Sequence, residues 1–143
     1  MTKASRTSAR RSAGSLIAAA KKARLRAYAP YSGFKVGAAL ESSDGRVFTG
    51  CNVENASYAA TCCAERTALA KAVSEGAKKF RRIAIVADTA DPCPPCGICR
   101  QALYEFAPCL EIIMKNLKGS LETACLEDLL PNAFHSEKMR KIR

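Results

Sequence analysis

The chain has 143 residues, 48% of them hydrophobic, and a formal net charge of +10. This length fits one domain that can bury a substantial core. No apolar run reaches the length of a membrane span, and the basic N-terminus lacks an apolar segment followed by a cleavage site. We therefore expect neither a membrane protein nor a secretory signal peptide.

The positive charge is concentrated at the two ends of the chain. Residues 1–26 contain eight basic residues and no acidic residue, and residues 137–143 contain four basic residues and one acidic residue. The rest of the chain is close to neutral, and terminal charge runs are usually solvated. We expect a disordered basic tail over residues 1–13, a folded domain over residues 14–135 and a basic tail over residues 136–143. No specific nucleic-acid partner is expected.

The eight cysteines indicate a reducing compartment. If three of them bind a metal, five remain, and five cannot pair completely within one chain. Their spacing also lacks the density of a small secreted disulfide scaffold. We therefore expect a cytoplasmic protein. The cysteines are Cys51, Cys62, Cys63, Cys93, Cys96, Cys99, Cys109 and Cys125.

The first predicted elements are a helix and a hairpin. Apolar residues recur at helical spacing from Ser15 to Tyr28, and this helix must end before Pro30. Phe34–Leu40 and Val47–Val53 are strand-like and flank a turn that contains Asp44-Gly45. An Asp-Gly pair between two such runs is typical of a β-hairpin.

The second half of the chain alternates helices and apolar strands. This order predicts an α/β fold: a three-layer α/β/α sandwich on a mixed sheet of about five strands. The predicted elements are a helix over Cys63–Glu75, a strand over Phe80–Val86, a helix over Gly97–Ala107, strands over Leu110–Met114 and Glu122–Cys125, and a helical turn over Leu126–Leu130.

Three thiols have the pattern of a catalytic zinc site. Cys96 and Cys99 are spaced i, i+3 at a helix start, so their side chains point the same way, and Cys63 opens another helix. Three protein ligands leave one position of tetrahedral Zn²⁺ open, whereas structural zinc usually takes four. Glu65 follows Cys63 by two residues and can reach the open position. Zinc acidifies a bound water, and a nearby carboxylate can move its protons.

Two arginines next to the ligands are candidates for stabilising the thiolates. Three thiolates around Zn²⁺ leave a net negative charge, and Arg66 and Arg100 can offset it through N–H···S contacts. The same residues allow an alternative: Cys93 could add a fourth ligand, or Cys62 could replace Cys63, and either change could produce a closed structural site.

Four internal segments and the C-terminal region together resemble the cytidine deaminases, specifically their compact three-cysteine branch. The resemblance runs from about Leu16 to Phe134, and joint agreement of several segments is more specific than any single motif. Zinc deaminases of this kind use a non-ligating Glu beside the metal. The matching segments are Tyr31–Leu40, Asn52–Asn55, Cys63–Thr67, Pro95–Gln101 and Leu129–Phe134.

The resemblance implies one Zn²⁺ per subunit, held by Cys63, Cys96 and Cys99, and hydrolytic deamination of cytidine and 2′-deoxycytidine in pyrimidine salvage. Glu65 would take a proton from the attacking water, protonate N3 of the base and deliver a proton to the departing amine. Backbone groups at Ala64 would hold the base edge.

The resemblance also assigns substrate contacts and an oligomer. Asn52 and Glu54 resemble the pair that binds the ribose 3′-hydroxyl, and Phe34 resembles the aromatic residue beside the pyrimidine. The family member of this size is typically a homotetramer with shared active sites. Three residues are expected at its subunit contacts: Phe134, contributed by a neighbouring subunit, and Ala56 and Tyr58, in a loop that crosses the interface.

The sequence departs from the family pattern at Ala59-Ala60-Thr61, where a Pro-Leu-Gly-like turn is common, and at the additional thiols Cys62 and Cys93. Competing interpretations are a polynucleotide or deoxycytidylate deaminase, an antibiotic deaminase and a zinc-stabilised nucleic-acid-binding protein. The pair Asn52 and Glu54 favours a free nucleoside over a polymer. Glu65 argues against a purely structural zinc module, which would gain nothing from it.

Overall fold

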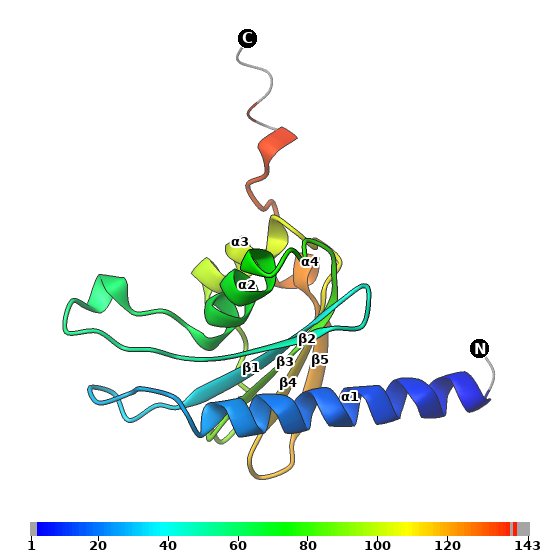
Figure 1. Ribbon diagram of the computed structural model, residues 1–143, viewed down its shortest axis with the longest axis horizontal. Coiled ribbons are helices and arrows are strands. Elements are labelled where there is room, and N and C mark those ends of the chain that lie inside the picture. Colours follow the sequence, from blue (N-terminus) through cyan, green and yellow to red (C-terminus); the bar gives the residue numbers. More distant parts are fainter. Residues whose placement is uncertain (1–2, 138, 140–143) are drawn as a thin grey trace.

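The computed structural model describes residues 3–137 and 139, of which residues 3–12 are described as backbone only. A five-stranded sheet with the order β2-β1-β3-β4-β5 lies between helices on both faces (Figure 1). β3 and β4 are parallel and the other neighbours are antiparallel, so the expected α/β/α sandwich with a mixed sheet is confirmed. The elements are α1 (Lys3–Arg24), β1 (Val36–Ser42), β2 (Val47–Cys51), η1 (Tyr58–Ala60), α2 (Ala64–Ser74), β3 (Phe80–Ala87), α3 (Gly97–Tyr104), β4 (Glu111–Asn116), β5 (Leu121–Cys125) and α4 (Leu126–Leu129).

Helix α1 covers one face of the sheet by itself. Its Leu16 and Ala20 are buried against small and branched residues of β1, β3 and β4. The helix approaches β1 so closely that a Cβ on Gly37 would lie 2.0 Å from the carbonyl oxygen of Ala20. Only glycine leaves room for this contact.

The opposite face carries the larger core, beneath α2, α3 and α4. Leu40, Ile83, Ile85 and Ile112 point into it from the strands and are almost fully buried. Helix α2 lies directly on β2, since a Cβ on Gly50 would be 2.4 Å from the carbonyl oxygen of Ala64. This contact fixes the N-terminus of α2 against the sheet.

The predicted hairpin is present, with Gly45 at φ 89° in the turn and the Ser42 amide donating to the Arg46 carbonyl at 2.9 Å. A positive φ of this kind favours glycine, which explains the Asp-Gly signal.

Helix α1 differs from its predicted bounds at both ends. It begins at Lys3 rather than Ser15, and therefore runs through residues that the sequence predicts as a disordered tail. It ends at Arg24, after which the amides of residues 25–27 donate to carbonyls three residues back. The amide of Tyr28 then donates to the carbonyl of Asn52, a contact between distant segments that sequence spacing does not reveal.

Among the side chains that the structure describes, the core contacts of α1 begin at Ala13, and the last buried residue is Ala133. The division into a domain over residues 14–135 and two tails stays a prediction, and most of the C-terminal tail lies outside the described residues. Among the helices described, none is long and apolar enough to cross a membrane.

Candidate active site

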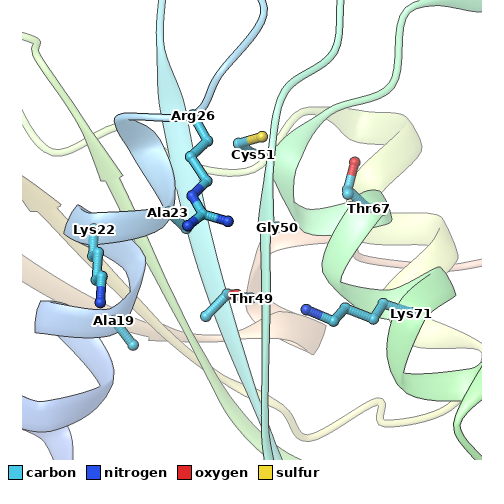
Figure 2. Close-up of a pocket in the computed structure, with 9 residues that line it drawn as sticks. All are labelled: Ala19, Lys22, Ala23, Arg26, Thr49, Gly50, Cys51, Thr67 and Lys71. Atoms are coloured by element: carbon cyan, nitrogen blue, oxygen red, sulfur yellow. The ribbon is translucent and has the colours of Figure 1, made fainter.

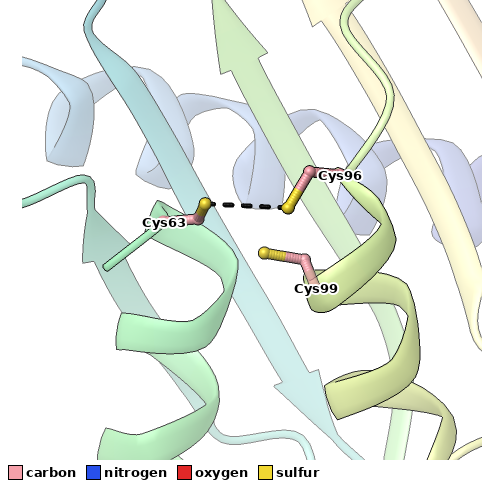
Figure 3. A group of neighbouring side chains, drawn as sticks. All are labelled: Cys63, Cys96 and Cys99. Carbon is pink, nitrogen blue, oxygen red and sulfur yellow. Dashed lines mark hydrogen bonds between the residues drawn. The ribbon is translucent and has the colours of Figure 1, made fainter. Parts of the chain in front are cut away.

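Three thiols converge where two helices begin. The sulfur atoms of Cys63, Cys96 and Cys99 all lie within 4.8 Å of one another, and Figure 3 shows them pointing toward a common centre. Cys63 is the N-cap of α2 and Cys96 is the N-cap of α3, each with extended backbone, and their sulfur atoms are 3.8 Å apart. Cys99 lies in the first turn of α3 and is fully buried. Helix N-termini stabilise negative charge, which favours thiolates here.

Shared hydrogen bonds within the cluster favour negative charge on one thiol. The hydrogen bond with Cys99 lowers the pKa of Cys63 to about 5, against the effect of burial, and Cys96 and Arg66 act in the same direction. The hydrogen bond with Cys63, together with burial, raises the pKa of Cys99. A pocket of three soft sulfur donors with an adjacent guanidinium fits Zn²⁺.

The additional thiols do not join the cluster. In the described part of the chain, the potential metal-binding group consists of Cys63, Cys96 and Cys99. The Cys62 sulfur instead contacts the Cys63 carbonyl at 3.7 Å, and the Cys93 sulfur faces the Pro94 carbonyl at 3.6 Å. The closed four-thiolate alternative is therefore not formed, and three protein ligands are the arrangement typical of a catalytic zinc site.

Glu65 is buried beside the thiols. It is 5% exposed and lines a cavity of about 220 Å³ together with Cys63, Cys96 and Ala64. Burial raises the pKa of Glu65 to about 7, and the negative charge of Cys63 adds to this effect. A carboxyl group with such a pKa can both accept and donate a proton near neutral pH.

The same cavity is also lined by Phe34, Asn52 and Glu54, the residues that the family resemblance assigns to the substrate. The Asn52 side chain accepts a hydrogen bond from the Val36 amide at 2.8 Å and donates one to the Phe34 carbonyl at 2.7 Å. Asn52 therefore holds the segment that carries Phe34. Five further residues line the cavity. Cys93 is expected from the sequence only as an alternative ligand, and the other four have strand or loop patterns that carry no functional signal: Val36, Thr61, Ile85 and Pro94.

Glu54 organises the turn that precedes Phe34. Its carboxylate accepts hydrogen bonds from the amides of Tyr31 and Ser32, at 2.8 and 3.2 Å, and from the Ser32 hydroxyl. The hydrogen bond from Ser32 holds the pKa of Glu54 below its usual value, with the backbone amides acting in the same direction. The carboxylate is therefore charged where it faces the cavity.

Three of the predicted substrate residues lie outside the cavity. Ala56 is exposed, and Tyr58 is 76% exposed with its ring edge-on to Tyr31 at a centroid distance of 5.9 Å. Phe134 is 58% exposed, and its carbonyl accepts a hydrogen bond from the Gln101 side chain. Figure 1 shows the loop with η1 extending beyond the sheet, on the same side as the loop that follows α1.

The two arginines have different roles. Arg66 donates to the Thr61 carbonyl at 2.9 Å and also lowers the pKa of Cys63, which agrees with contact to the thiols. Arg100 instead donates to the carbonyls of Pro95 and Leu129, both at 2.7 Å. In the structure, Arg100 supports the loop before Cys96 rather than making the N–H···S contact expected from the sequence.

Comparison with known proteins identifies the family. Residues 10–114 match the family model described as "Cytidine and deoxycytidylate deaminase zinc-binding region". The chain belongs to the cytidine and deoxycytidylate deaminase family. The family match covers all three thiols and Glu65, and Zn²⁺ is the metal that the donor set fits.

Relatives and solved structures agree with this assignment. A cytidine deaminase from Sporosarcina psychrophila is 51% identical over 87% of this chain and 92% of its own length. One from Halalkalibacterium halodurans is 52% identical over 87% and 95%. The crystal structure of a cytidine deaminase from Burkholderia pseudomallei is 53% identical with a TM-score of 0.83, covering 85% of this chain and 98% of that one.

Proposed function

We propose that this protein catalyses hydrolytic deamination of cytidine and 2′-deoxycytidine to uridine and 2′-deoxyuridine, with release of ammonia, as a step of pyrimidine salvage. The observation that carries the proposal is the cavity of about 220 Å³ that places buried Glu65 between a three-thiol cluster and the side chains of Asn52 and Glu54. Family membership supports the reaction type. Zn²⁺ held by the thiols would supply a Lewis acid that lowers the pKa of a water molecule.

Glu65 moves the protons of the reaction. It takes a proton from the attacking water and gives it to N3 of the base. It then takes the second proton, from the hydroxyl group now on C4, and delivers it to the amine as the C4–N bond breaks. Its burial beside Cys63 keeps the carboxyl group away from bulk solvent. The amide of Ala64 lies in the first turn of α2, where the helix offers no acceptor, and it holds the base edge.

Phe34, Asn52 and Glu54 select a free nucleoside. Phe34 packs beside the pyrimidine. Asn52 and Glu54 bind the ribose 3′-hydroxyl, using the donor and acceptor positions that their hydrogen bonds to the loops do not occupy. In a polynucleotide this hydroxyl is esterified, so a polymer would lose both contacts.

We further propose that the protein is a cytoplasmic homotetramer whose subunits share their active sites. The high exposure of Tyr58 and Phe134 in the single chain supports a role at contacts between subunits. All eight cysteines are free thiols, which suits a reducing compartment.

The direct test follows the absorbance loss of cytidine, deoxycytidine, cytidine monophosphate and a cytosine oligonucleotide, with zinc content measured in parallel. We expect turnover of both nucleosides and little or none of the other two substrates. Glu65→Gln should lower kcat by about 10³-fold or more while zinc is retained, because the amide cannot move the protons.

Glu75→Gln is the matched control, since Glu75 is exposed at the other end of α2. It should keep wild-type turnover. Wild-type turnover by Glu65→Gln would overturn the mechanism, and preferred turnover of the oligonucleotide would overturn the substrate class.

A further inference from the structure

A second, larger cavity lies at the open edge of the sheet, away from the thiols. It has a volume of about 500 Å³, and it is bordered by α1 on one side, by α2 on the other and by edge strand β2 (Figure 2). Cavities of this size hold small organic ligands. We call it the basic groove; its lining residues are Ala19, Lys22, Ala23, Arg26, Thr49, Gly50, Cys51, Thr67 and Lys71.

The charge of the groove is entirely positive. Lys22 comes from α1, Arg26 from the turn that follows α1 and Lys71 from α2, and no acidic residue lines the groove. Figure 2 shows the Arg26 and Lys71 side chains extending from opposite walls toward Thr49. Within the described part of the chain, none of these three cations forms an ion pair or a side-chain hydrogen bond. Their charges are therefore available to a ligand.

The floor adds neutral hydrogen-bonding groups. The Asn52 amide donates to the Val36 carbonyl and the Ser42 amide to the Arg46 carbonyl, so alternate residues of β2 pair with β1. By this alternation the backbone amides and carbonyls of Thr49 and Cys51 face away from β1, at the open edge of the sheet. The hydroxyl of Thr49 lies between the cationic side chains.

We propose that the basic groove binds a phosphate-bearing small molecule of nucleotide size. Convergent Lys and Arg side chains with nearby hydroxyl and amide donors are the chemistry that recognises a phosphate group. The volume beyond the phosphate accommodates a nucleoside, whose polar groups pair with the open backbone edge. A second copy of this chain is disfavoured as the occupant, because two such grooves would bring like charges together.

The groove is linked to the active site through α2. Thr67 lines the groove, and its hydroxyl donates to the carbonyl of Cys63 at 3.2 Å. Cys51 lines the groove and directly precedes Asn52, whose side chain positions the Phe34 segment. A ligand in the groove thus contacts residues next to both walls of the catalytic cavity.

Binding is tested with the zinc-loaded full chain by calorimetry at constant ionic strength. The probes are inorganic phosphate, cytidine monophosphate, adenosine monophosphate and adenosine, and amide NMR spectra locate the bound probe. We expect saturable binding of the two nucleotides, weaker binding of phosphate, none of adenosine at the groove, and shifts at Thr49, Cys51 and Thr67. The double variant Arg26→Gln, Lys71→Gln should weaken nucleotide binding about tenfold or more.

The matched control is the double variant Arg81→Gln, Lys118→Gln, which removes the same charge from exposed positions outside the groove. It should bind the nucleotides as tightly as the wild type. Equal binding of phosphate and both nucleotides would overturn the nucleotide-sized ligand, because the nucleoside would then add nothing to binding. Equal loss of binding in both double variants, shifts confined to the catalytic cavity, or binding only of acidic peptides or polynucleotides would overturn the proposal.

Discussion

The two walls of the catalytic cavity are built in different ways. The thiol wall is made of two helix N-termini, and Cys99, Ala64 and Glu65 in it are buried. The nucleoside wall is made of loops. They are held by hydrogen bonds that the Glu54 carboxylate accepts and that the Asn52 side chain accepts and donates. The thiol wall is therefore fixed by local helix geometry and core packing, whereas the nucleoside wall depends on contacts between distant segments.

Removing a buried thiol should have the largest effect on zinc affinity and turnover, because it removes a proposed metal ligand from the thiol wall. Cys99→Ser replaces a soft sulfur donor with a hard oxygen in a fully buried position. Loss of a residue that only hydrogen-bonds to a metal ligand lowers metal affinity roughly 10–100-fold. Loss of a ligand should lower zinc affinity by more than this, and turnover should fall with it. Elemental analysis and the cytidine assay measure both. Cys109→Ser, at an exposed thiol, is the control, and full zinc content in Cys99→Ser would contradict the assigned ligand set.

The close contacts of Gly50 and Gly37 with helices test whether the thiol wall depends on the packing of α2. An added Cβ in Gly50→Ala would lie 2.4 Å from the Ala64 carbonyl, and one in Gly37→Ala would lie 2.0 Å from the Ala20 carbonyl. Each should lower the free energy of unfolding by about 3 kcal/mol in urea titrations. Only Gly50→Ala pushes on α2, so only this variant should also lose zinc affinity. Equal zinc loss in both variants would show that the thiol wall is not locally determined.

Loss of charge on the nucleoside wall should have an intermediate effect. Glu54→Gln weakens the acceptor for the Tyr31 and Ser32 amides and for the Ser32 hydroxyl. Hydrogen bonds to charged groups are worth roughly 1.5–3 kcal/mol, so we expect KM for cytidine to rise about 10–100-fold. Zinc content should stay constant. Glu122→Gln, on exposed β5, is the control, and a loss of zinc in Glu54→Gln would mean that the two walls are not separable.

The same contrast explains what the sequence could predict. The thiol wall follows from short-range patterns, since Cys96 and Cys99 are one helical turn apart and Cys63 and Glu65 are neighbours. The order of helices and strands also follows from local periodicity and turn residues. The pairing of β1 with β3 carries no comparable local signal.

Long-range contacts account for the errors. The sequence predicts that Arg100 contacts the thiols because it follows Cys99, but one of its acceptors is the Leu129 carbonyl, 29 residues away. The family resemblance singles out Asn52, while its partners are Phe34, in the loop before β1, and Val36, at the start of β1. Spacing along the chain contains no information about such partners.

The smallest effects are expected from the exposed aromatic residues, which test whether the nucleoside wall extends to a neighbouring chain. Phe134→Ala should lower kcat/KM by about tenfold or less, as expected for loss of one aromatic contact. Leu121→Ala, also exposed, is the control and should keep wild-type kcat/KM.

Co-expression of Phe134→Ala with the inactive Glu65→Gln chain separates the two possible origins of this contact. If Phe134 serves a neighbouring site, mixed oligomers contain sites with an intact Glu65 from one chain and an intact Phe134 from the other. Activity should then exceed the sum of the separate variants several-fold. If Phe134 contributes only to the active site of its own chain, the activity of the mixture should not exceed the sum of the separate variants. The nucleoside wall would then be formed within a single subunit.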